Sequence, residues 1–148
     1  MHEQYMREAI EEAKLAQLAG DVPVGAVVVC EGKILARAHN EREVTADPTA
    51  HAEVLAIRRA AMALGRRRLH GCTLYVTLEP CPMCAGTIAM SGLDQVYFGA
   101  YDVRMGCAGS LYALPEDPAL GAGIPCMGGV LGDACEALMT GFFGKIRE

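Results

Sequence analysis

The sequence is poor in aromatic residues and has no long apolar run. Among its 148 residues there are no tryptophans, three phenylalanines and five tyrosines, so aliphatic side chains must form most of the core. Its apolar runs fall well short of the ~20 residues that cross a bilayer, and its N-terminus is acidic and amphipathic, unlike a signal sequence. No repeat or linker divides the chain. We therefore expect one domain over residues 1–148, a cytoplasmic location and no membrane partner.

Basic residues are also scarce. The chain has 13 Lys and Arg against 18 Asp and Glu, so its net charge is −5. This charge excludes a protein surface that attracts nucleic acid over its whole area. Any contact with nucleic acid must therefore be local. The basic run Arg66–Arg68 is a candidate phosphate patch, although a solvated helix end is the favoured explanation.

Cysteines are present, but seven is an odd number, and in a chain without a secretion signal disulfides are not expected. The close pair Cys81 and Cys84 instead favours metal or redox chemistry. The other five have apolar neighbours, and we expect them to be small buried hydrophobic residues. They are Cys30, Cys72, Cys107, Cys126 and Cys135.

Helix-like and strand-like segments alternate along the chain. Helical spacing is found at 4–19, 49–64, 80–92 and 133–147, strand patterns at 24–30, 34–40, 73–79 and 95–102, and a Gly- and Pro-rich loop at 115–129. A strand, a helix and a strand joined by short links imply a parallel crossover. The sequence therefore predicts an α/β fold of three layers, α/β/α, in which helices cover a mixed central sheet.

Three candidate metal ligands stand where helices are expected to start. Cys81 and Cys84 follow a buried strand and share one face of a first helical turn, where thiolates are stabilised. His51 lies near the start of the predicted helix 49–64. Two thiolates and one imidazole leave a fourth position open, as is typical of catalytic zinc. We therefore predict a zinc site at His51, Cys81 and Cys84.

Glu53 stands two residues after His51, and the two side chains can converge if that helix presents its N-terminal end to the metal. Zinc lowers the pKa of its water from ~15.7 to about 7. We expect Glu53 to take the proton of this water and return it to the substrate as a general acid and base, without being a ligand. A Cys-x-x-Cys pair also occurs in redox dithiols, and zinc can be purely structural. The neighbouring His-x-Glu pattern and the lack of a fourth close ligand disfavour these alternatives.

His-x-Glu followed by Pro-Cys-x-x-Cys is the signature of zinc-dependent nucleobase deaminases. The segments DPTAHAEVLAIR, LYVTLEPCPMCAGTI and GCAGSL resemble the bacterial tRNA-specific adenosine deaminases of the zinc-dependent cytidine/deoxycytidylate deaminase superfamily. The resemblance extends from Tyr5 to about Leu114. It implies a cytidine-deaminase-like fold, a homodimer, and hydrolysis of the wobble adenosine of a tRNA anticodon stem-loop to inosine.

The resemblance also implies substrate contacts. Asn40 matches a base-contacting asparagine, although it would also suit a turn, and Asp102 matches an aspartate near the substrate backbone, where it could bind a ribose 2′-OH. Arg104, close to the expected entrance, is a candidate phosphate contact. The matching further places Val24 and Ala52 in the base pocket, and Phe142 and Phe143 at the family's aromatic pair.

Two departures from the family keep other substrates open. The chain reads LGAGIPCMGGV where the family commonly has an Asn-His pair, and only Lys145 and Arg147 supply charge to its short tail. Each missing phosphate contact would weaken RNA binding. A deaminase of free guanine, cytosine or cytidine is therefore the alternative. A noncatalytic, zinc-stabilised partner subunit is a third hypothesis, but it would have no use for Glu53.

Overall fold

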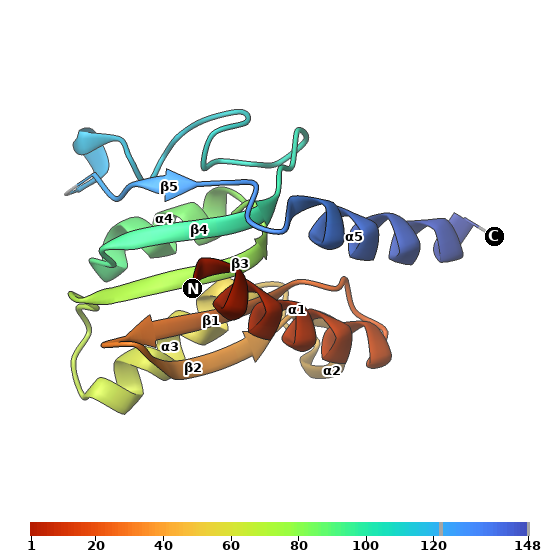
Figure 1. The fold of residues 1–148 in the computed structure, drawn as a ribbon, viewed down its shortest axis with the longest axis horizontal. Coiled ribbons are helices and arrows are strands. Elements are labelled where there is room, and N and C mark those ends of the chain that lie inside the picture. Colours follow the sequence, from red (N-terminus) through yellow and green to blue (C-terminus); the bar gives the residue numbers. More distant parts are fainter. Residues whose placement is uncertain (122, 148) are drawn as a thin grey trace.

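The computed structural model describes residues 1–121 and 123–147 and contains a five-stranded sheet in the order β2-β1-β3-β4-β5. Helices cover both faces of this sheet (Figure 1), so the predicted three-layer α/β/α fold is confirmed. The elements are α1 (His2–Leu18), β1 (Gly25–Cys30), β2 (Lys33–His39), α2 (Arg42–Thr45), α3 (Ala52–Leu64), β3 (Cys72–Leu78), α4 (Pro82–Ser91), β4 (Gln95–Ala100), the 3-10 helix η1 (Pro118–Leu120), β5 (Cys126–Met127) and α5 (Gly132–Arg147).

The sheet is mixed, as predicted. β1 pairs with β2 and β3 in antiparallel fashion, whereas β3, β4 and β5 are parallel. The β1–β2 hairpin turns at Glu31 and Gly32, which both have positive φ angles, 52° and 75°. Two consecutive left-handed residues match the right-handed twist of the flanking strands.

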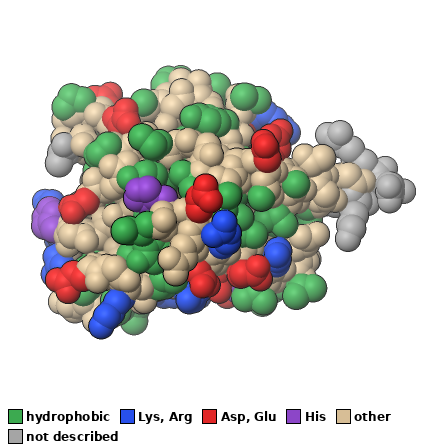
Figure 2. Space-filling model, in the orientation of Figure 1, with side chains coloured by type: hydrophobic (Ala, Val, Ile, Leu, Met, Phe, Trp, Pro, Cys, Tyr) green, Lys and Arg blue, Asp and Glu red, His purple; other side chains and the backbone are tan. Residues whose placement is uncertain are grey.

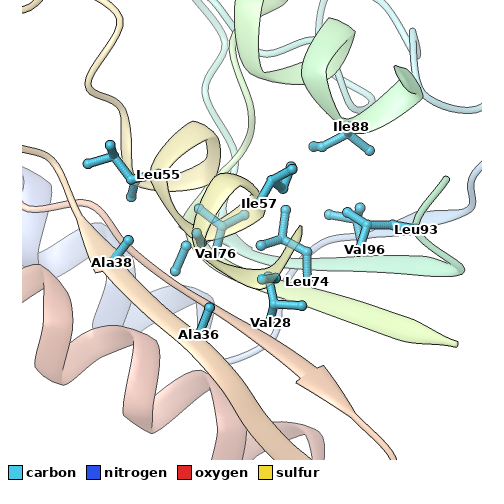
Figure 3. Packing of buried hydrophobic residues seen from close by; sticks show 14 of the residues in the cluster. Val28, Ala36, Ala38, Leu55, Ile57, Leu74, Val76, Ile88, Leu93 and Val96 are labelled. Carbon is cyan, nitrogen blue, oxygen red and sulfur yellow. The ribbon is translucent and has the colours of Figure 1, made fainter. Parts of the chain in front are cut away.

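Aliphatic side chains fill the space on both faces of the sheet. On one face Leu55 and Ile57 of α3 and Ile88 of α4 lie over sheet residues (Figure 3). These are Val28, Leu74, Val76 and Val96. On the other face, α1 and α5 pack through Met6, Ala9, Ile10 and Cys135 against Val27, Val29 and Tyr75. The alternation of Val27, Val28 and Val29 between the two faces gives β1 its continuous apolar pattern.

The start of α3 differs from the predicted position. We expected a helix from Thr49, but α3 begins at Ala52 and His51 is its N-cap residue. Asp47 is the reason, because its Oδ1 accepts hydrogen bonds from the backbone N–H and the hydroxyl of Thr49, at 2.8 and 2.7 Å. This turn around the side chain competes with the helix. The later start puts His51 and Glu53 at the N-terminal end of α3.

The predicted loop over 115–129 is only partly a loop. It contains η1 and the two-residue strand β5, while Ala122 lies outside the described residues. The strand expected at 95–102 ends at Ala100, and the short helix α2 was not predicted. Of the five cysteines expected to be buried, Cys30 and Cys126 are partly exposed. No helix within the described residues has the length and apolarity needed to span a membrane.

Candidate active site

The candidate site lies at one edge of the sheet, where β3 and β4 end. These parallel strands are in register at Leu78 and Ala100, so the segments that follow them emerge side by side. α3 and α4 both begin at this edge, with His51 and Cys81 as their N-cap residues. Pro82 opens α4, as its fixed φ angle favours. Two helix N-termini, with their positive dipole ends, therefore meet beside the end of β3.

The three predicted metal ligands converge at this edge. The ligand atoms of His51, Cys81 and Cys84 all lie within 4.8 Å of one another. Nδ1 of His51 is 3.7 Å from Sγ of Cys81 and 3.5 Å from Sγ of Cys84. The facing atom of the histidine is therefore Nδ1. One imidazole nitrogen and two sulfurs form a donor set that suits zinc and leaves a coordination position open.

Hydrogen bonds within the cluster favour the thiolate form of Cys81. The hydrogen bond from Cys84, together with that from His51, lowers the pKa of Cys81 to about 4. The pKa of Cys84 is raised, because it shares a proton with Cys81 and is buried. The hydrogen bond to Cys81 also raises the pKa of His51. Without a metal ion, Cys84 and His51 therefore keep their protons to higher pH than isolated groups do, and metal binding competes with these protons.

Glu53 is the second residue of α3 and is buried beside the cluster, with a relative exposure of 4%. Burial raises its pKa to about 7. A carboxyl group that titrates near neutral pH can both accept and return a proton under working conditions. The side chain can therefore serve as a general acid and base next to the metal ligands.

Asn40 joins the site through the start of α3. It follows β2, is buried, and its Oδ1 accepts a 2.8 Å hydrogen bond from the backbone N–H of Ala52. A backbone N–H can only donate, so this bond fixes the orientation of the amide group. Its backbone N–H donates in turn to the carbonyl of Val24, at 3.1 Å. Val24, Asn40 and Ala52 therefore form one buried group beside His51.

Asp102 and Arg104 lie in the segment after β4. Oδ1 of Asp102 accepts hydrogen bonds from the backbone N–H groups of Arg104 and Met105, at 3.0 and 3.1 Å. One oxygen of Asp102 is thus used to shape its own turn, and the described residues give no hydrogen bond to the other. Arg104 is exposed. Both residues remain substrate contacts only as predictions.

The other predicted residues lie on α5 and after the end of α3. Phe142 and Phe143 form an edge-to-face pair on α5, with ring centroids 5.4 Å apart, and α5 extends beyond the body of the sheet (Figure 1). Arg66–Arg68 follow Gly65, the C-cap of α3, at the end opposite His51, which is about 20 Å away along 13 residues. Arg66 donates to the carbonyls of Arg68 and His70 and so stabilises this turn.

Sequence reasoning missed two buried carboxylates, those of Asp21 and Glu79. Asp21 accepts hydrogen bonds from the backbone of Val22 and Glu43 and from the Arg42 guanidinium, which ties α2 to the end of α1. Glu79 accepts hydrogen bonds from the segment after β4. A signal for Glu79 was present, because a charged residue closes the buried run TLYVTLE.

The known proteins that this chain resembles are deaminases. Residues 1–100 match the family described as the zinc-binding region of cytidine and deoxycytidylate deaminases, and this range includes the cluster and Glu53. The chain is 49% identical over 146 residues to a tRNA-specific adenosine deaminase of Bacillus subtilis (strain 168), over 99% of this chain and 91% of the relative. It is 43% identical over 146 residues to a protein of the same name from Aquifex aeolicus (strain VF5), over 99% of this chain and 96% of the relative.

Solved structures give a similar result. One, from studies of A-to-I editing by tRNA:A34 deaminases at the wobble position of transfer RNA, superposes with a TM-score of 0.88 at 37% identity, over 91% of this chain and 98% of that one. A guanine deaminase from Bacillus subtilis superposes with a TM-score of 0.67 at 42% identity, over 68% of this chain and 65% of that one.

Proposed function

The chain belongs to the cytidine and deoxycytidylate deaminase family, and we propose that it converts the wobble adenosine of a tRNA anticodon to inosine by hydrolysis. The observation that carries this proposal is the convergence of His51, Cys81 and Cys84 beside the buried Glu53, in a chain whose near full-length relatives are tRNA-specific adenosine deaminases. The reaction adds water to the adenine ring and releases ammonia.

In this proposal His51, Cys81 and Cys84 hold zinc. When bound, zinc makes its water acidic enough to ionise near neutral pH. Glu53 would take one proton from the attacking water and deliver it to the ring nitrogen. It would then take the proton of the added hydroxyl group and deliver it to the amine, which leaves as ammonia. In the metal-free protein, burial raises the pKa of this carboxyl group to about 7, which suits a group that both accepts and donates protons. The amide of Asn40, with its oxygen held by Ala52, presents its Nδ2 donor to an acceptor on the purine edge.

The substrate is an anticodon stem-loop, because its unpaired bases can be turned outward at little cost. On the face seen in Figure 2, basic side chains lie singly among acidic and apolar ones, and the whole chain carries a net charge of −5. Recognition therefore depends on a few local contacts, for which Asp102, Arg104, Phe142 and Phe143 are the proposed residues, with Val24 and Ala52 lining the base pocket.

We also propose that the chain acts as a homodimer in the cytoplasm. A group of apolar side chains is exposed beside the site, and such a group is typical of an interaction surface. We propose that a second copy of the chain covers it. The group consists of Tyr101, Val103, Met105, Leu111 and Tyr112. Sedimentation velocity should give a particle of twice the 15.7 kDa chain mass, and a monomer over the working concentration range would contradict this part of the proposal.

Free guanine is the second candidate substrate, favoured by the likeness to a guanine deaminase. The two functions are separated by one experiment. The protein is incubated with a synthetic stem-loop that carries a wobble adenosine and, in parallel, with guanine and with adenosine. Inosine formed in the stem-loop, with no ammonia from the free compounds, supports the tRNA function. Ammonia from guanine alone would replace it with the second candidate.

A further inference from the structure

Glu79 is a charged residue at a buried position, where an apolar side chain would be expected if packing were its only role. It follows β3 directly, precedes Pro80 and the metal-ligand candidate Cys81, and has a relative exposure of only 2%. Burial of a carboxylate is costly unless its oxygens are hydrogen-bonded. No Lys, Arg or His side chain within residues 1–121 and 123–144 forms an ion pair with it. Its partners must therefore be neutral donors.

All four of these donors come from one segment, residues 102–110. Oε1 accepts from the backbone N–H of Asp102, at 2.9 Å, and from the hydroxyl of Ser110. Oε2 accepts from the backbone N–H groups of Ala108 and Ser110, at 3.1 and 2.8 Å. A carboxylate has about four acceptor sites, and here two donors reach each oxygen. Glu79 thus holds both ends of the segment 102–110.

The same segment is fitted closely to the strand end that leads to Cys81. The backbone N–H of Cys107 donates to the carbonyl of Pro80, at 2.8 Å. At Gly106 an added Cβ would collide with the carboxyl group of Glu79 and with the carbonyl of Asp102. Only glycine therefore allows the chain to pass this close to the carboxylate.

We propose that Glu79 is a positioning residue for the RNA substrate, acting by fixing the segment 102–110 beside the metal ligands. This inference rests on the proposed function, in which Asp102 and Arg104 of the segment contact the substrate backbone. The metal ligands and Glu53 are held separately by α3 and α4. Loss of the Glu79 anchor should therefore weaken RNA binding much more than it slows the chemical step.

Glu79→Gln is the informative variant, because it keeps the shape of the side chain but replaces one acceptor oxygen with an amide donor. At least one backbone N–H of the segment then faces another donor. Ser110→Ala removes one donor of the four and is the milder variant, for use if Glu79→Gln does not fold. Glu116→Gln is the matched control, since Glu116 also accepts a backbone N–H, that of Cys126 at 2.8 Å, but is exposed in another loop.

The experiment uses the whole 148-residue chain and measures KM and kcat for inosine formation in the anticodon stem-loop, together with zinc content per chain. For Glu79→Gln we expect KM to rise roughly ten- to hundredfold, the factor for losing one or two hydrogen bonds to a charged group. kcat should stay within about threefold of the parent value, and the zinc content per chain should equal that of the parent. Ser110→Ala should raise KM by a few fold, and Glu116→Gln should leave it unchanged. An unchanged KM in Glu79→Gln, or a loss confined to kcat or zinc, would overturn the proposal.

Hydrogen exchange separates this inference from the proposed function. In Glu79→Gln the amides of Asp102, Ala108 and Ser110 should exchange faster, while those of α3 and α4 keep their protection. A parent protein that does not deaminate the stem-loop would refute the proposed function alone, since exchange would still report the anchor. Unchanged exchange in the segment, with an active parent, would refute the anchor alone.

Discussion

The side-chain oxygen of Asn40 accepts a 2.8 Å hydrogen bond from the backbone N–H of Ala52, the first residue of α3. Asn40 therefore satisfies an N–H group at the helix start, and in the proposed function the Nδ2 of the same amide donates to the base. Asn40→Asp keeps the acceptor and removes the donor, whereas Asn40→Ala removes both. The two variants separate stability from recognition.

We expect Asn40→Ala to lower the free energy of unfolding by about 0.5–2 kcal/mol, as the loss of a helix cap does, and Asn40→Asp to change it much less. Both should reduce kcat/KM on the stem-loop by roughly tenfold or more, because both variants remove the Nδ2 group that donates a hydrogen bond to the base. Denaturant titration and steady-state kinetics measure the two effects. Full activity of Asn40→Asp would show that the amide donor has no part in recognition.

Glu53 should be needed for turnover and not for metal binding. We expect Glu53→Ala to reduce kcat by roughly 100- to 10,000-fold, the usual contribution of a positioned general acid and base, while zinc per chain stays at the parent value. Metal analysis and inosine detection on one preparation test both statements. Glu11→Ala, at an exposed glutamate of α1, is the control and should match the parent. Loss of zinc from Glu53→Ala would refute the role assigned to it.

Cys84 should be needed for the metal itself. Its sulfur lies 3.5 Å from Nδ1 of His51 and is fully buried, so Cys84→Ala removes one of three ligands from a closed cluster. We expect this variant to lose zinc and to unfold at a lower temperature, because metal binding contributes to folding. Cys135→Ala, at a cysteine buried on the opposite face of the sheet, should keep its zinc. A fully metallated Cys84→Ala would contradict the ligand assignment.

Zinc affinity should increase with pH. The pKa of Cys84 and that of His51 are both raised by the hydrogen bonds within the cluster, so both groups hold protons in the metal-free protein at pH values where isolated groups would begin to lose them. Zinc must displace these protons, and each one released makes the affinity about tenfold weaker for each pH unit lowered. We therefore expect at least a tenfold gain from pH 6 to pH 7. Competition with a chromophoric chelator measures it, and a pH-independent affinity would mean that the cluster is already deprotonated.

The fold and the clustering of the three candidate metal ligands could be predicted because their signals are local. Alternating patterns defined the strands and helices, and the spacing of Cys81 and Cys84 after a buried strand indicated a shared face at a helix start. The start of α3 was predicted too early, because the Asp47 turn depends on a side-chain hydrogen bond that a periodic pattern does not contain.

The anchoring role of Glu79 could not be predicted for a different reason. Its donors lie 23 to 31 residues further along the chain, and they reach the carboxylate only because β3 and β4 are parallel and in register. The strand β5 was likewise missed, since two residues show no periodicity and pair only through their neighbour β4. Contacts of this kind follow from the topology of the sheet and not from any short stretch of sequence.

The most direct test of the central claim is inosine formation in a synthetic anticodon stem-loop with a wobble adenosine, measured beside ammonia release from free adenosine, guanine and cytosine. We predict inosine in the stem-loop and no ammonia from the free compounds, which would mean that the sequence of the segment 121–129 does not prevent recognition of tRNA. Ammonia from a free base, with an unmodified stem-loop, would contradict the assigned substrate while leaving the zinc chemistry in place.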